Sequence, residues 1–152
     1  MSRTQVRLII EQEGKVLLLR QTPKNGGAFT LAGGKIEAGE TAIQALIRES
    51  WEEAGIILRE DDLQLVHTML QIKGKRHRFI LFFKAIRWTG VLASREPDKF
   101  KEVVWQPLDA LPQSTNPRIV LALHYYRQGL LFSELDARVP TPGPVWAHWS
   151  PR

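Results

Sequence analysis

The chain has 152 residues, of which 43% are hydrophobic and 24% are charged, and it contains no cysteine. These values fit one globular domain with its own core, and the lack of cysteine excludes disulfides and thiolate catalysis. The formal net charge of +5 favours anionic partners, with nucleotides ahead of RNA. We find no signal-peptide pattern and no apolar run long enough to cross a bilayer, and therefore expect a cytoplasmic protein that does not enter membranes.

Two β-rich runs open the chain, Gln5–Glu11 and Lys15–Arg20, and Gly14 lies between them. Together they predict a hairpin. Residues 16–19 are continuously apolar, which is typical of a strand that is covered on both faces.

A third strand is expected at Phe29–Ala32 and leads into the pair Gly33 and Gly34. Two adjacent glycines allow the backbone to approach a ligand closely, so that N–H groups can contact phosphate. A tight turn would use the same two residues, and the sequence leaves both interpretations open.

The stretch from Gly34 to Ile56 carries the strongest signal of the chain. At helical spacing, Glu49, Glu52 and Glu53 share one face, and Arg48 is the only cation beside them. Three carboxylates so close together repel one another, and a bound divalent cation would offset that repulsion. Oxygen ligands suit Mg²⁺, with Mn²⁺ as the alternative. The opposite face is mostly apolar and consists of Ile43, Leu46, Ile47, Ser50 and Ala54. Thr41 is the expected N-cap and Gly55 the expected stop.

The second half predicts another hairpin, Leu63–Ile72 and Arg76–Trp88, followed by a short strand at residues 103–105. Its turn holds the most basic run of the chain, residues 73–78. Such a run either attracts phosphates or is a solvated turn, and for Arg76 and Arg78 the sequence does not decide.

A last helix is expected from Asn116, with a proline in its first turn, to just before Gly129. From residue 140 onward the composition shifts to proline and tryptophan. Three alternatives stay open for this tail: a flexible segment, tryptophans packed on the domain, or a clasp on a second subunit in a homodimer.

The pattern of Gly34, Glu40 and Arg48–Ile56 resembles the box of the Nudix hydrolase family. Every charged and glycine position of that motif is matched. Ser50 departs from the motif, because the family usually has an aliphatic residue there. The resemblance implies an α/β fold, an α/β/α sandwich whose mixed sheet lies between the box helix and the C-terminal helix. It covers residues 1–139 and leaves 140–152 as a tail.

The resemblance also implies roles for residues. It assigns the metal to Glu49, Glu52 and Glu53, and leaves Glu52 as ligand or general base, with Arg48 orienting it. A second, weaker signature adds a carboxylate at Glu96, for which Glu102 is the competitor. The residues implied in substrate binding are Gly33, Gly34, Lys35 and Arg78.

The implied reaction is metal-dependent hydrolysis of a phosphoanhydride bond in a nucleoside diphosphate that is linked to another group. Residues 96–99 and 108–112 are similar to the MutT-like pyrophosphatases, which release pyrophosphate and a monophosphate from nucleoside triphosphates. The alternatives are nucleotide sugars, dinucleoside polyphosphates, capped RNA, or a nucleotide-binding or RNA-binding module without hydrolysis.

Overall fold

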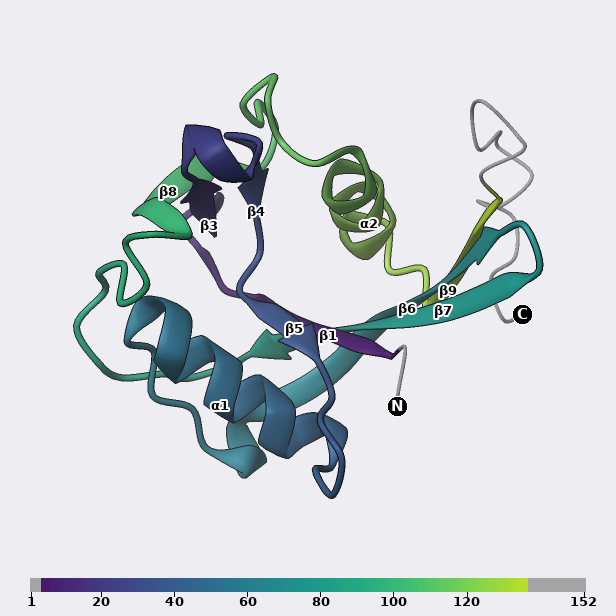
Figure 1. Ribbon diagram of the computed structural model, residues 1–152, viewed down its shortest axis with the longest axis horizontal. Helices are drawn as coiled ribbons and strands as arrows, with labels where there is room; N and C mark the ends of the chain where they lie inside the picture. The colour runs from purple at the N-terminus through teal and green to yellow at the C-terminus, as the bar shows by residue number, and fades with distance from the viewer. Residues whose placement is uncertain (1–3, 137–152) are drawn as a thin grey trace.

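The computed structural model describes residues 4–136 (Figure 1). The three residues before the tail and the tail itself, 140–152, therefore lie outside the described residues, as do the alternatives stated for the tail. No helix in the described part is long and apolar enough to span a membrane. The elements are β1 (Gln5–Ile9), β2 (Glu11–Gln12), β3 (Lys15–Gln21), β4 (Phe29–Thr30), β5 (Gly33–Lys35), α1 (Ala42–Ala54), β6 (Leu63–Lys73), β7 (Arg76–Ala85), β8 (Phe100–Pro107), α2 (Pro117–Arg127) and β9 (Phe132–Asp136).

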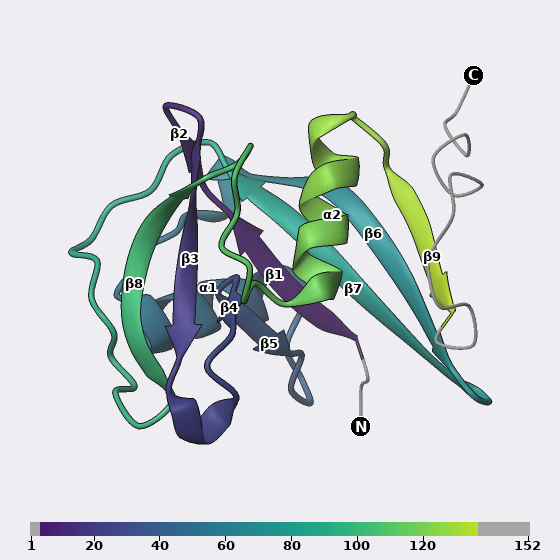
Figure 2. The same ribbon diagram turned by 90° about the horizontal axis from the view of Figure 1, so that it is seen from above.

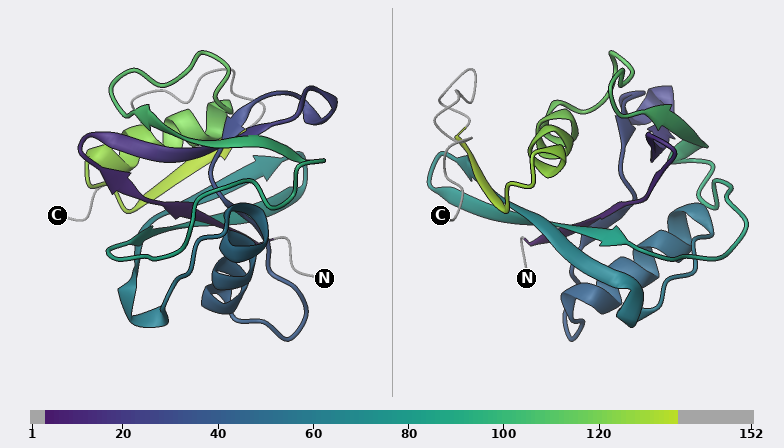
Figure 3. Two further views of the ribbon diagram at one scale, coloured as in Figure 1. Left: turned by 90° about the vertical axis from the view of Figure 1, so that its left-hand side faces the viewer. Right: turned by 180° about the vertical axis from the view of Figure 1, so that it is seen from behind.

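Two sheets form the middle of the molecule. The first is mixed and has the order β5-β1-β7-β6-β9, with β1 parallel to β7 and β9 parallel to β6. The second is antiparallel, and in it β3 pairs with β2, β4 and β8. Helix α1 covers one side of these sheets and α2 the other (Figure 1; Figure 3, right). The expected α/β/α sandwich is confirmed.

The core is divided between the two sides. Along β3, Leu17 and Leu19 belong to the apolar cluster under α1, whereas Val16 and Leu18 belong to the cluster under α2. All four side chains are buried. The prediction of a strand covered on both faces is confirmed, and burial on both faces is the main apolar driving force for this layer.

The N-terminal hairpin differs from the prediction. The run Gln5–Glu11 is not one strand, because β1 joins the mixed sheet and only the two-residue β2 pairs with β3. Glu13 and Gly14 both have positive φ, 52° and 77°, as a tight hairpin turn requires. The division places β1 against β5, with Val6 opposite Gly34.

The strand ends were also misjudged where long-range pairing decides them. The predicted strand to Trp88 ends at Ala85. The Ile86 N–H still donates to the Asp62 carbonyl, but the Asp62 N–H donates to the Arg59 carbonyl and is lost to the ladder. Strand β8 is longer than predicted, since it pairs along most of β3. The edge strand β9 was not predicted.

The ends of α1 follow the sequence closely. The Gln44 N–H donates to Thr41 Oγ1 and the Thr41 N–H donates to Gln44 Oε1, so that a capping box closes the first turn. Gly55 ends the helix with φ 72°, and a Cβ there would lie 2.6 Å from the Val91 carbonyl oxygen. Both predicted boundaries of the helix are confirmed.

Ser50 lies on the buried face of α1 and is fully inaccessible to solvent. Within residues 4–136 its hydroxyl has no hydrogen-bond partner. A buried hydroxyl without a partner keeps its desolvation cost.

We therefore expect Ser50→Ala to raise the free energy of unfolding by about 1 kcal/mol, because it removes that cost and favours the helix. Urea denaturation measures the change. Ser94→Ala is the matched control, since the Ser94 hydroxyl donates to the Phe100 carbonyl at 2.6 Å. A loss of stability in Ser50→Ala would show that the hydroxyl is satisfied in solution.

His67 connects β6 to the segment that follows α2. Its ring is buried, with Nδ1 2.7 Å from the Leu130 carbonyl oxygen and Nε2 2.8 Å from Ser133 Oγ. These partners suit a neutral ring that donates from Nδ1 and accepts at Nε2. Burial lowers the pKa of His67 below its ordinary value of 6.5.

The unfolded chain takes up a proton on His67 near pH 6.5, whereas the folded chain resists it until a lower pH. Between these values the unfolded state holds more protons, so stability falls as the pH drops. We expect the loss between about pH 7 and pH 5 to be smaller in His67→Gln, as measured by thermal unfolding across that range. Identical pH slopes in the two proteins would contradict this.

Candidate active site

A cavity of about 580 Å³ opens between the C-terminal half of α1, strands β1 and β5, and the start of α2. It collects residues that are far apart in the sequence. Its polar lining includes Gln5, Arg7, Gln21, Thr30, Gly33, Gly34, Lys35, Glu37, Glu49, Glu53, Lys99, Asn116 and Arg118.

Glu53 is the most buried charged group of this cavity, with 1% of its surface exposed. The Gly33 N–H donates to its Oε1 at 2.8 Å, and Lys99 Nζ lies 3.8 Å from its Oε2. Burial raises the pKa of Glu53 to about 8; the Gly33 N–H opposes this rise, and the charge of Glu49 adds to it. A cation beside Oε2 would therefore be needed to keep the side chain fully ionised.

Gly33 holds this carboxylate in place. Its φ of 145° is rarely open to other residues, and a Cβ would lie 1.9 Å from the Val6 carbonyl oxygen. At Gly34, a Cβ would lie 2.7 Å from Glu49 Oε1. Both glycines line the cavity as expected, but the Gly33 N–H binds Glu53 and is not turned to a phosphate.

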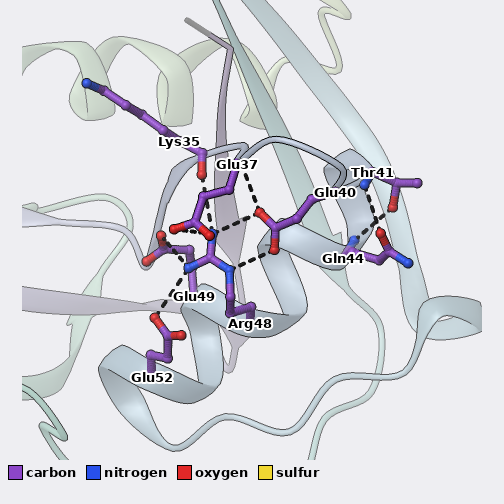
Figure 4. A network of polar contacts seen from close by, with 8 residues as sticks. All are labelled: Lys35, Glu37, Glu40, Thr41, Gln44, Arg48, Glu49 and Glu52. Atoms are coloured by element: carbon purple, nitrogen blue, oxygen red, sulfur yellow. Dashed lines mark hydrogen bonds and ion pairs between the residues drawn. The ribbon is translucent and has the colours of Figure 1, made fainter. Parts of the chain in front are cut away.

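Arg48 gathers four carboxylates around its guanidinium group, as Figure 4 shows, and two of them, Glu37 and Glu49, line the cavity. Its Nε lies 2.7 Å from Glu40 Oε2 and its Nη2 3.0 Å from Glu40 Oε1, which is a two-pronged pair. Its Nη1 donates to Glu49 at 3.1 Å and to Glu52 at 3.3 Å. The hydrogen bond from Arg48 lowers the pKa of Glu40. The predicted contact with Glu52 exists, yet the principal partner is Glu40, for which the sequence indicated no role.

The three box carboxylates are not equivalent. Glu49 and Glu53 line the cavity, whereas the Glu52 side chain is 48% exposed beside Arg48 and does not line it. Burial raises the pKa of Glu49, and Arg48 opposes that rise. Within residues 4–136 no three His, Asp or Glu side chains are arranged as a metal site. The metal-ligand roles expected of Glu49, Glu52 and Glu53 stay a prediction. The two carboxylates that line the cavity suit Mg²⁺, which completes its shell with water and phosphate.

The two carboxylates of the second signature, Glu96 and Glu102, lie outside the cavity lining, and their roles stay a prediction. Glu102 lies 3.8 Å from Arg20, and the Glu96 carbonyl accepts the N–H groups of Lys99 and Phe100. The segment instead supplies Lys99 to the cavity, because this turn starts β8 close to Glu53.

Two further cations, Arg7 of β1 and Arg118 of α2, line the cavity. Arg7 Nη1 donates to the Leu31 carbonyl at 2.9 Å, and burial lowers the pKa of Arg7 while Glu53 opposes this. Arg118 begins α2, and its N–H donates to the Asn116 side chain. No pattern in the sequence pointed to these cations, since each is a single residue in an otherwise ordinary strand or helix.

The two remaining predicted substrate residues lie apart from the carboxylates. Lys35 lines the cavity, but its side chain extends away from Glu49 and Glu52 (Figure 4). Arg78 lies in a neighbouring cavity, which shares Arg118 with this one.

Comparison with known proteins identifies the family of the chain. Residues 1–124 match the family model of the NUDIX domain. The chain belongs to the Nudix hydrolase family. It is 25% identical over 128 residues to phosphatase NudJ of Escherichia coli K12, with 82% of each chain covered. It is similar to the MutT NUDIX hydrolase of Burkholderia pseudomallei at TM-score 0.71 and 28% identity, covering 82% of this chain and 97% of that one. The E. coli ORF135 protein gives TM-score 0.69 and 27% identity, with 82% and 88% covered.

In this Nudix protein, Gly33→Ala is expected to lower the free energy of unfolding by more than about 3 kcal/mol, because the methyl group collides with β1 and the backbone is strained. Gly27→Ala is the matched control: its φ is 70°, but a Cβ there meets no atom within 4 Å. The control should lose about 1 kcal/mol. Urea denaturation compares the two, and equal losses would show that contact with Val6 is unimportant.

Proposed function

We propose that this Nudix protein hydrolyses a phosphoanhydride bond in a nucleoside diphosphate-linked substrate, with the aid of Mg²⁺ or Mn²⁺. The observation that carries the proposal is the cavity itself, where Glu49 and Glu53 face the cations of Arg7, Lys99 and Arg118. Carboxylates suit a divalent cation, and the basic residues suit the phosphates that share it.

Each residue has a proposed part in the reaction. Glu49 and Glu53 would hold the cation, which screens phosphate charge and lowers the pKa of a bound water. Lys99 and Arg7 would bind phosphate oxygens and orient the scissile bond. Glu52, which is exposed and lies outside the cavity lining, is proposed as a further metal ligand or as the general base. Glu96, in the loop before β8, and Glu102, within β8, are the alternative candidates for the general base.

A nucleoside triphosphate, cleaved to monophosphate and pyrophosphate, is the first candidate substrate. It is supported by the likeness to a solved structure named MutT NUDIX hydrolase and by the segments 96–99 and 108–112. Nucleotide sugars, dinucleoside polyphosphates and capped RNA are the alternatives. A binding module without hydrolysis is less favoured, because every box glutamate is present and two of them line the cavity. A cytoplasmic location belongs to the same proposal.

The test is release of pyrophosphate and monophosphate from a panel of nucleoside triphosphates, with Mg²⁺ and then with chelator. Glu53→Gln should lower turnover by about a hundredfold or more. Its folding should be preserved, because the amide oxygen can accept the Gly33 N–H and no charge is buried. The turnover of Glu52→Gln, compared with that of Glu53→Gln, shows how much the exposed carboxylate of Glu52 contributes.

Glu60→Gln is the control, since it removes one charge from a distant turn and should leave turnover unchanged. Release that persists in chelator, or in Glu53→Gln, would overturn the proposal. No release from any triphosphate would redirect the panel to sugar nucleotides and dinucleotides.

A further inference from the structure

A second cavity, of about 340 Å³, lies beside the candidate active site. It is formed where the β6–β7 hairpin passes the first turn of α2, which lies across these strands in Figure 2. Its lining is strongly basic and consists of Gln71, Lys73, Arg76, His77, Arg78 and Arg118. No aspartate or glutamate of the described chain is among these residues.

The strand register explains why the charges meet. Lys73 is paired with Arg76, and Gln71 with Arg78. Side chains alternate between the faces of a strand, so these residues share the face of Met69 and Ile80, which pack in the cluster under α2. Two cations directly opposite each other on one face repel, which is a cost for the hairpin.

The neighbouring strand β9 carries acidic residues on the other face of the sheet. Glu134 and Asp136 are in register with Leu70 and Ile72, and by alternation they belong to the face opposite Lys73 and Arg76. Among the described residues, the cavity on the α2 face is therefore lined by basic and neutral side chains, which suits an anion.

Arg118 connects the two cavities. Its Nη1 donates to Gln71 Oε1 at 3.1 Å, which is a neutral partner, and Arg118 lines both cavities. Burial, and then the charge of Arg78, lower the pKa of Arg118. A phosphate between these two guanidinium groups would reverse this unfavourable interaction.

We propose that the basic cavity binds a second phosphate of the substrate, remote from the anhydride that is hydrolysed. The inference rests on the proposed hydrolase function. It narrows the substrate to nucleotides that carry, beyond the hydrolysed anhydride, a further phosphate attached to a second nucleoside. That phosphate belongs either to the far end of a dinucleoside polyphosphate or to the next linkage of a 5′-triphosphorylated oligoribonucleotide. The chemistry at the cavity is the same in both.

The test compares three substrates: adenosine triphosphate, diadenosine tetraphosphate and a 5′-triphosphorylated tetranucleotide. The variant is Arg76→Gln, and the matched control is Lys75→Gln, which removes an equal charge from the same hairpin outside the cavity lining. We expect Arg76→Gln to raise KM about tenfold for whichever substrate reaches the cavity, as loss of a charged hydrogen bond predicts. Its KM for adenosine triphosphate, and all constants of Lys75→Gln, should stay unchanged.

Binding without turnover provides an independent readout. In chelator, the affinity for the two larger ligands should fall with salt more steeply than that for adenosine triphosphate, and Arg76→Gln should reduce the difference. The ligand whose affinity changes in Arg76→Gln identifies the source of the second phosphate.

Equal effects of Arg76→Gln and Lys75→Gln, or equal effects on all three ligands, would overturn the inference. Loss of the proposed function looks different, because metal-dependent hydrolysis would then be missing from the wild-type protein with every substrate.

Discussion

The structure depends on one buried carboxylate and the backbone that holds it. Glu53 lies at the base of the cavity, where its Oε1 is fixed by the Gly33 N–H. That hydrogen bond requires β5 to lie directly against β1, which only glycine permits at this position. A carboxylate that is buried in this way has a raised pKa and is costly to ionise. The fold thus keeps this carboxylate in a fixed orientation, which suits the metal-binding role proposed for it.

Arg48 offsets part of the repulsion among the carboxylates of α1. Arg48 lies five residues before Glu53 on α1, and its shortest contacts are with Glu40 in the preceding loop. It also contacts Glu49 and Glu52, so the acidic side of the helix is partly neutralised from outside the cavity. Glu49 belongs both to this network and to the cavity lining, so a change at Arg48 can reach the site through it. The exposed side chain of Glu52 is less restrained by contacts than those of Glu49 and Glu53.

What the sequence predicted well was local. The caps of α1, the β6–β7 turn and the α2 start at Asn116 depend on residues within a few positions of each other. What it missed was set by pairing across the chain: the division of the first run into β1 and β2, the edge strand β9, and Lys99 beside Glu53. Helical spacing placed three glutamates on one face but could not tell which of them the sheet would cover. Burial separates Glu53 from Glu52, and burial is a property of the folded chain.

The net charge of +5 now has a structural meaning. Carboxylates gather on α1, while cations gather on β1, the hairpin and the start of α2, and each group repels its own members. The two groups face a shared space without pairing fully, because Lys99 is 3.8 Å from Glu53 and Arg118 bonds to a neutral amide. The proposed substrate, a phosphate chain with its cation, would satisfy both groups at once, with the metal beside the carboxylates and the phosphate oxygens beside the basic residues. The cost of separating these charges would then be offset in the complex, so ligand binding should stabilise the folded state.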